Sequence, residues 1–239
     1  MLSPITLKFL EAVKFNNNTE WMHRNHDLYV QERKRFLSLI ECLLADMQKI
    51  DSNLSDVVAK DCIYRFNRDL RFVPDKSQPY KLHFGACLCS GWRKSSLPCY
   101  YLHIQPWDCS MVWWWSRCPS KEEINRIRLY IWKHRDEWLE ITENKSFKSY
   151  FWTVERKDDV MAERRMKTKA WKALLEQAWE VLARKIVNDK DMLEIFCYHG
   201  RVVDHHMTDE EILSDNGYSE VIDWFKKMKI FNDFLINCF

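Results

Sequence analysis

The chain has 239 residues, a formal net charge of +2, 46% hydrophobic residues and 30% charged residues. This composition is ordinary for a folded globular protein, and the length is sufficient to bury a sizeable core. Because the net charge is near zero, no overall field favours nucleic acid or an anionic membrane, and any anion site must come from local clustering.

The sequence predicts a reduced, cytoplasmic protein with no metal or cofactor. The N-terminal residues lack the basic segment and long apolar run of a signal peptide, and no stretch reaches about 18 apolar residues, so no membrane span is expected. The nine cysteines form no CxxC pair, and without an export signal we expect free thiols. Cys87 and Cys89 are expected on opposite faces of a strand, which disfavours a zinc site. Glu20, His23 and His26 have helical spacing but no evident fourth ligand.

The first fifty residues predict two helices, over about 5–15 and from residue 20 to 50. Asn18 is the expected N-cap of the second helix. Apolar residues of that helix recur at intervals of three, four or seven, which indicates one buried stripe: Tyr29, Phe36, Ile40, Leu43, Met47 and Ile50.

The middle of the chain alternates with a period of two, as strands do. We expect strands over 62–68, 81–88 and 99–106, with the polar, basic loop 89–98 as the tip of a hairpin between the last two.

After residue 119 the sequence predicts mainly helices. Ser120 and Glu123 form a capping-box pattern at the start of a helix that reaches about residue 142. A basic helix over 162–187, a strand over 191–199 and an amphipathic helix over 219–239 follow.

Together these elements predict one α+β domain over 1–239, with a central, mostly antiparallel sheet and helices from both ends packed on it. Its parts are N-terminal helices over about 5–50, a β-rich region over about 61–118 and a helical part over about 120–239.

The densest chemistry lies in RFNRDLRFVPDKSQPYK, residues 65–81. Arginine offers a planar fork of donors that suits bidentate contacts to phosphate or carboxylate. Asp69 and Asp75 are too few to pair with every cation, so the segment predicts an anion site. Its candidate residues are Arg65, Arg68, Arg71, Lys76, Tyr80 and Lys81.

The strand alternation extends this site. His83 shares a face with Lys81, and His103 shares a face with Tyr101. If these faces coincide, a polar floor results, over which Arg93 and Lys94 of the basic loop would close. The alternative is a solvated turn laced with ion pairs, which contribute little energy, beside histidines that only form structural hydrogen bonds.

This stretch resembles the signature of a widespread bacterial family of uncharacterised proteins, domain of unknown function 2461. Its pattern, RxxRDxRF followed by DK and a tyrosine, falls on Arg65, Arg68, Asp69, Arg71, Phe72, Asp75, Lys76 and Tyr80. Three residues rather than two separate Lys76 from Tyr80. FLEAVKFNNNTEW, HFGA, RKSSLPCYYLHIQP and TDEEIL also resemble parts of the family. The resemblance implies membership and a functional use of the arginines, but no reaction.

Several functions remain open. An enzyme acting on a small anionic metabolite would use His83 or His103 to move protons, with Asp69 orienting a neighbour. A non-catalytic module would bind an anionic ligand or the acidic segment of a partner protein. Nucleic-acid binding is a weaker alternative because acidic residues dilute the basic helix. The sequence predicts no membrane contact and carries no signal of oligomeric state.

The chain has 12 tryptophans and 4 glycines, where a glycine share of about 7% would give about 17. The family resemblance implies glycine where this chain has Trp92, Trp107, Trp113–Trp115 and Trp152. One hypothesis is that these positions are UGA codons, which some bacterial lineages read as glycine. The alternatives are a buried aromatic cluster or a stacking platform. We expect MVWWWSRCPS, residues 111–120, to mark a turn at a strand end.

Overall fold

The computed structural model describes residues 2–71, 74–91, 95, 97–115, 121–145 and 204–239. The chain forms two compact units, Met1–Arg117 with Asp204–Asn232 and Cys118–Val203 with Asp233–Phe239. Helices accompany a four-stranded antiparallel sheet, which confirms the predicted α+β class. The single domain stays a prediction.

Three helices open the first unit: α1 (Pro4–Phe15), α2 (Thr19–Arg24) and α3 (His26–Gln48). Asn18 caps α2 as predicted, since its side-chain oxygen accepts the backbone N–H of Trp21 at 2.9 Å. The single helix predicted from residue 20 is wrong, because Asn25 separates α2 from α3. Its carboxamide donates to the carbonyl of Trp21 at 2.9 Å and so satisfies the end of α2.

A buried carboxylate joins α1 to α3. Glu32 is fully buried, accepts a hydrogen bond from the hydroxyl of Thr6 at 2.6 Å, and forms an ion pair with Arg35 at 3.1 Å. A carboxylate in this position is tolerated only with such partners, because burial of an unpaired charge is strongly unfavourable.

The sheet contains β1 (Phe84–Leu88), β2 (Cys99–Ile104), β3 (Ser110–Trp115) and β4 (Asp204–Met207), in the order β1-β2-β3-β4. The β1–β2 pairing confirms the predicted hairpin. The strand predicted over 62–68 is wrong. Its first residue ends α4 (Ala59–Cys62), and the rest forms only the isolated bridges Ile63–Ala86 and Asn67–Tyr80.

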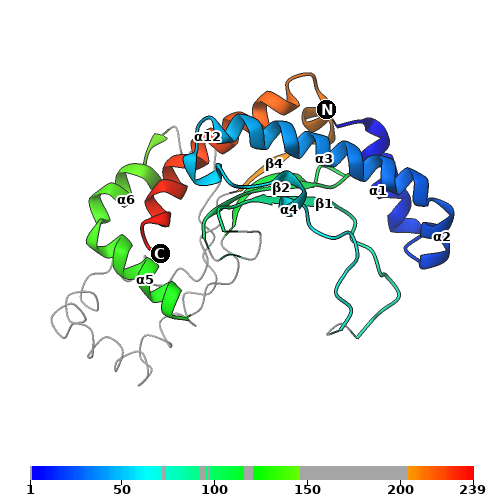
Figure 1. Ribbon diagram of the computed structural model, residues 1–239, viewed down its shortest axis with the longest axis horizontal. Coiled ribbons are helices and arrows are strands. Elements are labelled where there is room, and N and C mark those ends of the chain that lie inside the picture. The colour runs from blue at the N-terminus through cyan, green and yellow to red at the C-terminus, as the bar shows by residue number, and fades with distance from the viewer. Residues whose placement is uncertain (1, 72–73, 92–94, 96, 116–120, 146–203) are drawn as a thin grey trace. The chain divides into compact units, whose positions relative to one another are not determined.

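One face of the sheet is buried against α3 and α12 (Gly217–Ile236), which lie along it in Figure 1. The ring of Phe36 on α3 stacks 5.4 Å from Phe84 of β1, and Phe225 on α12 lies 5.3 Å from Tyr100 of β2. Burying one such aromatic side chain stabilises the fold by roughly 1.5–3 kcal/mol. The predicted C-terminal helix is thereby confirmed, with its start two residues earlier than expected.

In the second unit, α5 (Lys121–Lys133) and α6 (Arg135–Thr142) replace the single helix predicted over 120–142. Phe234 lies 5.3 Å from both Tyr130 and Trp138, at the core of this unit. The helix predicted over 162–187, the strand over 191–199 and the N-cap Ser120 lie outside the described residues. No helix in the described part of the chain is long and apolar enough to cross a bilayer.

Trp113–Trp115 do not form the predicted turn, because all three belong to β3 and pair with Tyr101, Tyr100 and Cys99. Residues 116–120, the rest of the stretch predicted to mark a turn at a strand end, lie outside the described residues. The turn between β2 and β3 lies earlier. There Trp107 has a φ of +67° and Asp108 a φ of +55°. Their backbone N–H groups donate to the carboxylate of Asp209, at 3.0 and 3.3 Å, which begins the short helix α11 (Asp209–Leu213).

A left-handed backbone costs a non-glycine residue roughly 1–2 kcal/mol, so Trp107 occupies a conformation that favours glycine. We predict that Trp107→Gly is more stable than Trp107→Ala by about 1 kcal/mol, measured by chemical denaturation. Alanine is the matched control because both variants lose the contact of Lys14 with the Trp107 ring. Equal stability of the two variants would refute the strain at position 107.

The coding DNA tests the glycine hypothesis directly. UGG codons at Trp92, Trp107, Trp113–Trp115 and Trp152 would refute the hypothesis that these positions are glycine.

Candidate functional site

The strand register gathers polar side chains on one face of the sheet, here called the polar face. Gly85 pairs with His103, His103 with Met111, and Met111 with His206. Because residues two apart on a strand share a face, Tyr101 and Asp204 lie on this face as well. It is the opposite face from the one buried against α3 and α12.

The two histidines predicted as a pair lie together. The ring centroids of His83 and His103 are 4.1 Å apart. The Nδ1 atom of His103 lies 3.3 Å from the hydroxyl of Tyr101, and its Nε2 atom lies 3.1 Å from the side-chain oxygen of Gln105. Since that oxygen only accepts, Nε2 carries the proton, and in the neutral ring Nδ1 then accepts from Tyr101. The His103 ring is thus held in place on both sides.

Burial keeps both imidazoles uncharged. It lowers the pKa of His83 to about 3, with further contributions from the nearby His103 and Lys81. Burial also lowers the pKa of His103, although the hydrogen bond to Gln105 acts in the opposite direction. At neutral pH these rings act through hydrogen bonds rather than as cations.

Gly85 makes room for the Tyr101 hydroxyl. A Cβ atom at position 85 would lie 2.5 Å from the phenolic oxygen of Tyr101, closer than van der Waals contact permits. The glycine therefore allows the contact between Tyr101 and His103.

The arginines of residues 65–81 are largely paired within their own loop. The carboxylate of Asp69 accepts two hydrogen bonds from the guanidinium group of Arg71, at 2.9 and 2.7 Å. Arg65 forms an ion pair with the same carboxylate at 3.3 Å. The hydrogen bonds from Arg71 hold the pKa of Asp69 well below its usual range. Arg68 donates to the carbonyl of Gln78 at 3.1 Å and so braces the loop.

Lys81 is the loop residue that meets the polar face. Its amino group lies 5.5 Å from the ring centroid of Tyr64, and the Tyr64 ring is edge-on to Tyr101, 6.1 Å away. Burial and then the positive charge of Arg65 lower the pKa of Lys81. Lys76 is exposed on the loop, and Arg93 and Lys94 lie outside the described residues.

Comparison with protein families identifies the chain. The family model described as "Conserved hypothetical protein (DUF2461)" matches residues 5–234. This chain belongs to the DUF2461 family. The match includes the arginine-rich segment and confirms the family resemblance predicted from the sequence. No curated protein and no solved structure matches the chain.

Within this DUF2461 protein, the ring of Tyr80 is buried in the core. Its ring stacks on Phe66 at 5.9 Å in the apolar core, and Asn17 hydrogen-bonds both its backbone N–H and its carbonyl, at 2.9 and 3.0 Å. The tyrosine that reaches the polar face from the hairpin is Tyr101.

A third histidine, His206, lies at this site, although the sequence offered Asp204, His205 and His206 only as a weak cluster. The Nε2 atom of His206 lies 3.2 Å from the carboxylate of Asp204, two residues earlier on β4. The neighbouring His205 ring instead stacks on Trp224 of α12 at 3.6 Å. Strand alternation provides the signal, but only once β4 is recognised as a strand.

The cysteines correct another expectation. Cys87, Cys89 and Cys99 form a buried cluster with Tyr101. The assignment of Cys87 and Cys89 to opposite faces was wrong, because residues two apart on a strand share a face. Among the described residues, no three His, Cys, Asp or Glu side chains are arranged to hold a metal ion.

The partly buried His83 predicts an acid-sensitive fold. As pH falls from 6.5 toward about 3, an unfolded chain takes up a proton that folded His83 does not, so stability is lost over that window. We predict that His83→Gln reduces the proton uptake on unfolding at pH 5 by up to about one, measured by denaturation across pH. His23→Gln, at an exposed position on α2, is the control. An unchanged slope for His83→Gln would contradict the assignment.

Proposed function

We propose that this DUF2461 protein binds a small anionic ligand, bearing phosphate or carboxylate, where residues 65–81 meet the polar face. Lys81 and the arginines Arg65, Arg68 and Arg71 supply the positive charge, with Lys76 at the loop surface. His103 and Tyr101 supply neutral hydrogen-bonding groups beside them. Arg93 and Lys94 belong to the same proposal through their place in the basic loop.

The observation that carries the proposal is the half-buried ammonium group of Lys81. Burial and a second cation, Arg65, both disfavour its charge, and the same ammonium disfavours a charge on His83. A bound anion would relieve this repulsion and would be attracted more strongly than at an exposed lysine, because water screens it less.

An enzymatic role is one form of this proposal. Its proton carrier would be His83 or His103, with Asp69 holding the two arginines in place. The histidines differ in their suitability for that role. His83 is a weak base because its pKa is lowered to about 3. His103 already has a hydroxyl group and a carboxamide oxygen in contact with its two ring nitrogens.

A non-catalytic module that binds an acidic protein segment is the alternative. The exposure of the Arg65 and Arg71 side chains, 64% and 75%, supports it, because a shallow basic loop suits a peptide better than a small metabolite. Nucleic acid would require a longer basic stripe and a steep dependence on salt. The proposal places the protein in the bacterial cytoplasm, where the seven described cysteines, all free thiols, would stay reduced.

A thermal-shift screen tests the anion site. We predict that inorganic phosphate and a panel of anionic metabolites raise the Tm of the wild type, whereas Lys81→Met and Arg68→Ala lose most of that increase. Lys34→Met, at an exposed position on α3, is the matched control and should respond as the wild type does. Chloride at equal ionic strength separates binding from screening.

The results of the thermal-shift screen distinguish the three proposed functions. If Arg68→Ala, Arg71→Ala and Lys81→Met all respond to phosphate as the wild type does, the anion site is wrong. If an acidic peptide stabilises the wild type and small anions do not, the module is favoured over the enzyme. A response only to nucleic acid, lost steeply with salt, would favour the third function.

A further inference from the structure

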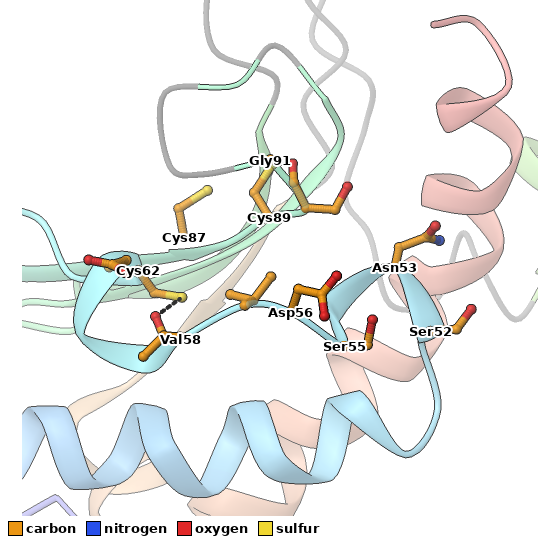
Figure 2. A pocket seen from close by; sticks show the side chains of 12 residues that line it. Ser52, Asn53, Ser55, Asp56, Val58, Cys62, Cys87, Cys89 and Gly91 are labelled. Carbon is orange, nitrogen blue, oxygen red and sulfur yellow. Dashed lines mark hydrogen bonds between the residues drawn. The ribbon is translucent and has the colours of Figure 1, made fainter.

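A pocket of about 550 Å³ lies elsewhere in the first unit. Its lower wall is the segment from η1 (Ser52–Leu54) to α4, and its upper wall is the end of β1 with the first residues of the hairpin loop. Figure 2 shows Asp56 on the lower wall, with Cys89 and Gly91 opposite. Pockets that bind small molecules have volumes of about 300–1,000 Å³, so this one is large enough for a metabolite.

The lower wall is held in place before any ligand arrives. The side-chain amide of Gln48, on α3, donates to the carbonyls of Leu54, Ser55 and Val57 at 2.9, 3.3 and 3.1 Å. A single side chain thus secures the non-helical segment through three backbone groups.

A buried hydrogen bond ties the same wall to the sheet. The carboxylate of Asp51 is buried and accepts the hydroxyl of Tyr100, on β2, at 2.8 Å. Its other oxygen accepts the backbone N–H of Asn53 at 3.0 Å. A wall secured in this way loses little conformational freedom on binding, which favours affinity.

The described lining of the pocket carries a charge opposite to that of residues 65–81. Its twelve described lining residues include the carboxylates of Asp56 and Asp61 and no lysine, arginine or histidine. Hydroxyl and amide groups of Ser52, Asn53, Ser55 and Ser90 complete the polar part. This lining favours a cation that also donates hydrogen bonds.

Three cysteines complete the lining of the pocket. Cys62, Cys87 and Cys89 are all buried, and the Cys62 thiol donates to the carbonyl of Val58 at 3.6 Å. The hydrogen bond to Cys87 and burial raise the pKa of Cys89. Uncharged thiols act as small, polarisable apolar groups, so they offer a surface to the hydrocarbon part of a ligand.

We propose that this pocket binds a small aliphatic amine, whose hydrocarbon chain lies on the thiols of Cys62, Cys87 and Cys89 and whose ammonium groups meet Asp56 and Asp61. This site does not depend on the anion site, because its described lining residues carry the opposite charge and none of them belongs to the anion site.

A matched pair of probes tests the site. Butane-1,4-diamine should raise the Tm and should slow the modification of the three thiols by N-ethylmaleimide, followed residue by residue by mass spectrometry. Butane-1,4-diol has the same carbon chain without charge and should do neither. Asp56→Asn and Asp61→Asn should each weaken diamine binding about fivefold, whereas Asp27→Asn, an exposed acid on α3, should not.

A steric variant, Ser55→Trp, adds a second test because it fills the pocket from an exposed wall position. It should abolish diamine binding while leaving phosphate binding intact. Equal effects of the diamine and the diol would overturn the proposal. Diamine binding that survives all three pocket variants, or that leaves thiol modification unchanged, would overturn it as well. None of these results alters the response of Arg68→Ala to phosphate, so the two proposals can be refuted independently of each other.

Discussion

The pairing register of the four strands is the constraint on which the first unit depends. It sends Phe84, Leu102 and Val112 to the face that α3 and α12 bury, and it sends Tyr101, His103 and Met111 to the other. A shift of one residue in any pair would exchange the two faces, placing aromatic core residues where the histidines lie. The apolar face thus determines where the polar face lies, and the chemistry of the site follows from the packing of the core.

The lysine beside the polar face and the arginines of the loop differ in their exposure and in how their charges are balanced. The exposed guanidinium groups of Arg65 and Arg71 share Asp69, and ion pairs of this kind contribute little in water. Lys81 is half-buried, and its neighbours oppose its charge rather than balance it. The number of arginines made residues 65–81 conspicuous, but the physical case for an anion rests more on the single lysine.

Local patterns predicted those elements whose cause is local. The periodicities of 3.6 and 2 placed α1, α3, α12 and the β1–β2 hairpin, and the hairpin alternation was sufficient to bring His83 and His103 together. The break at Asn25 was missed because an asparagine is tolerated within a helix and also ends one. The strand expected over 62–68 failed because its alternation finds a partner at only two positions, Ile63 and Asn67.

Other features arise from contacts between distant residues, which no local pattern reveals. Glu32 is charged and lies near the apolar stripe of α3, and its burial depends on Thr6, 26 residues earlier. Tyr80 was grouped with cations by proximity in sequence, whereas its ring stacks on Phe66 in the core. The thiol-lined pocket depends on Gln48 and on the Asp51–Tyr100 bond, whose partners are 49 residues apart.

The space beneath the Tyr101 hydroxyl has a consequence for how mutational data on this protein are interpreted. Position 85 contributes no functional group, yet any side chain there would displace the phenol that contacts His103. A scan of substitutions would therefore rank one of the chain's 4 glycines among the sensitive positions. Intolerance at position 85 would report an excluded volume rather than a catalytic or ligand-binding atom. At this site, the sensitivity of a position to substitution does not show that its residue takes part in the chemistry.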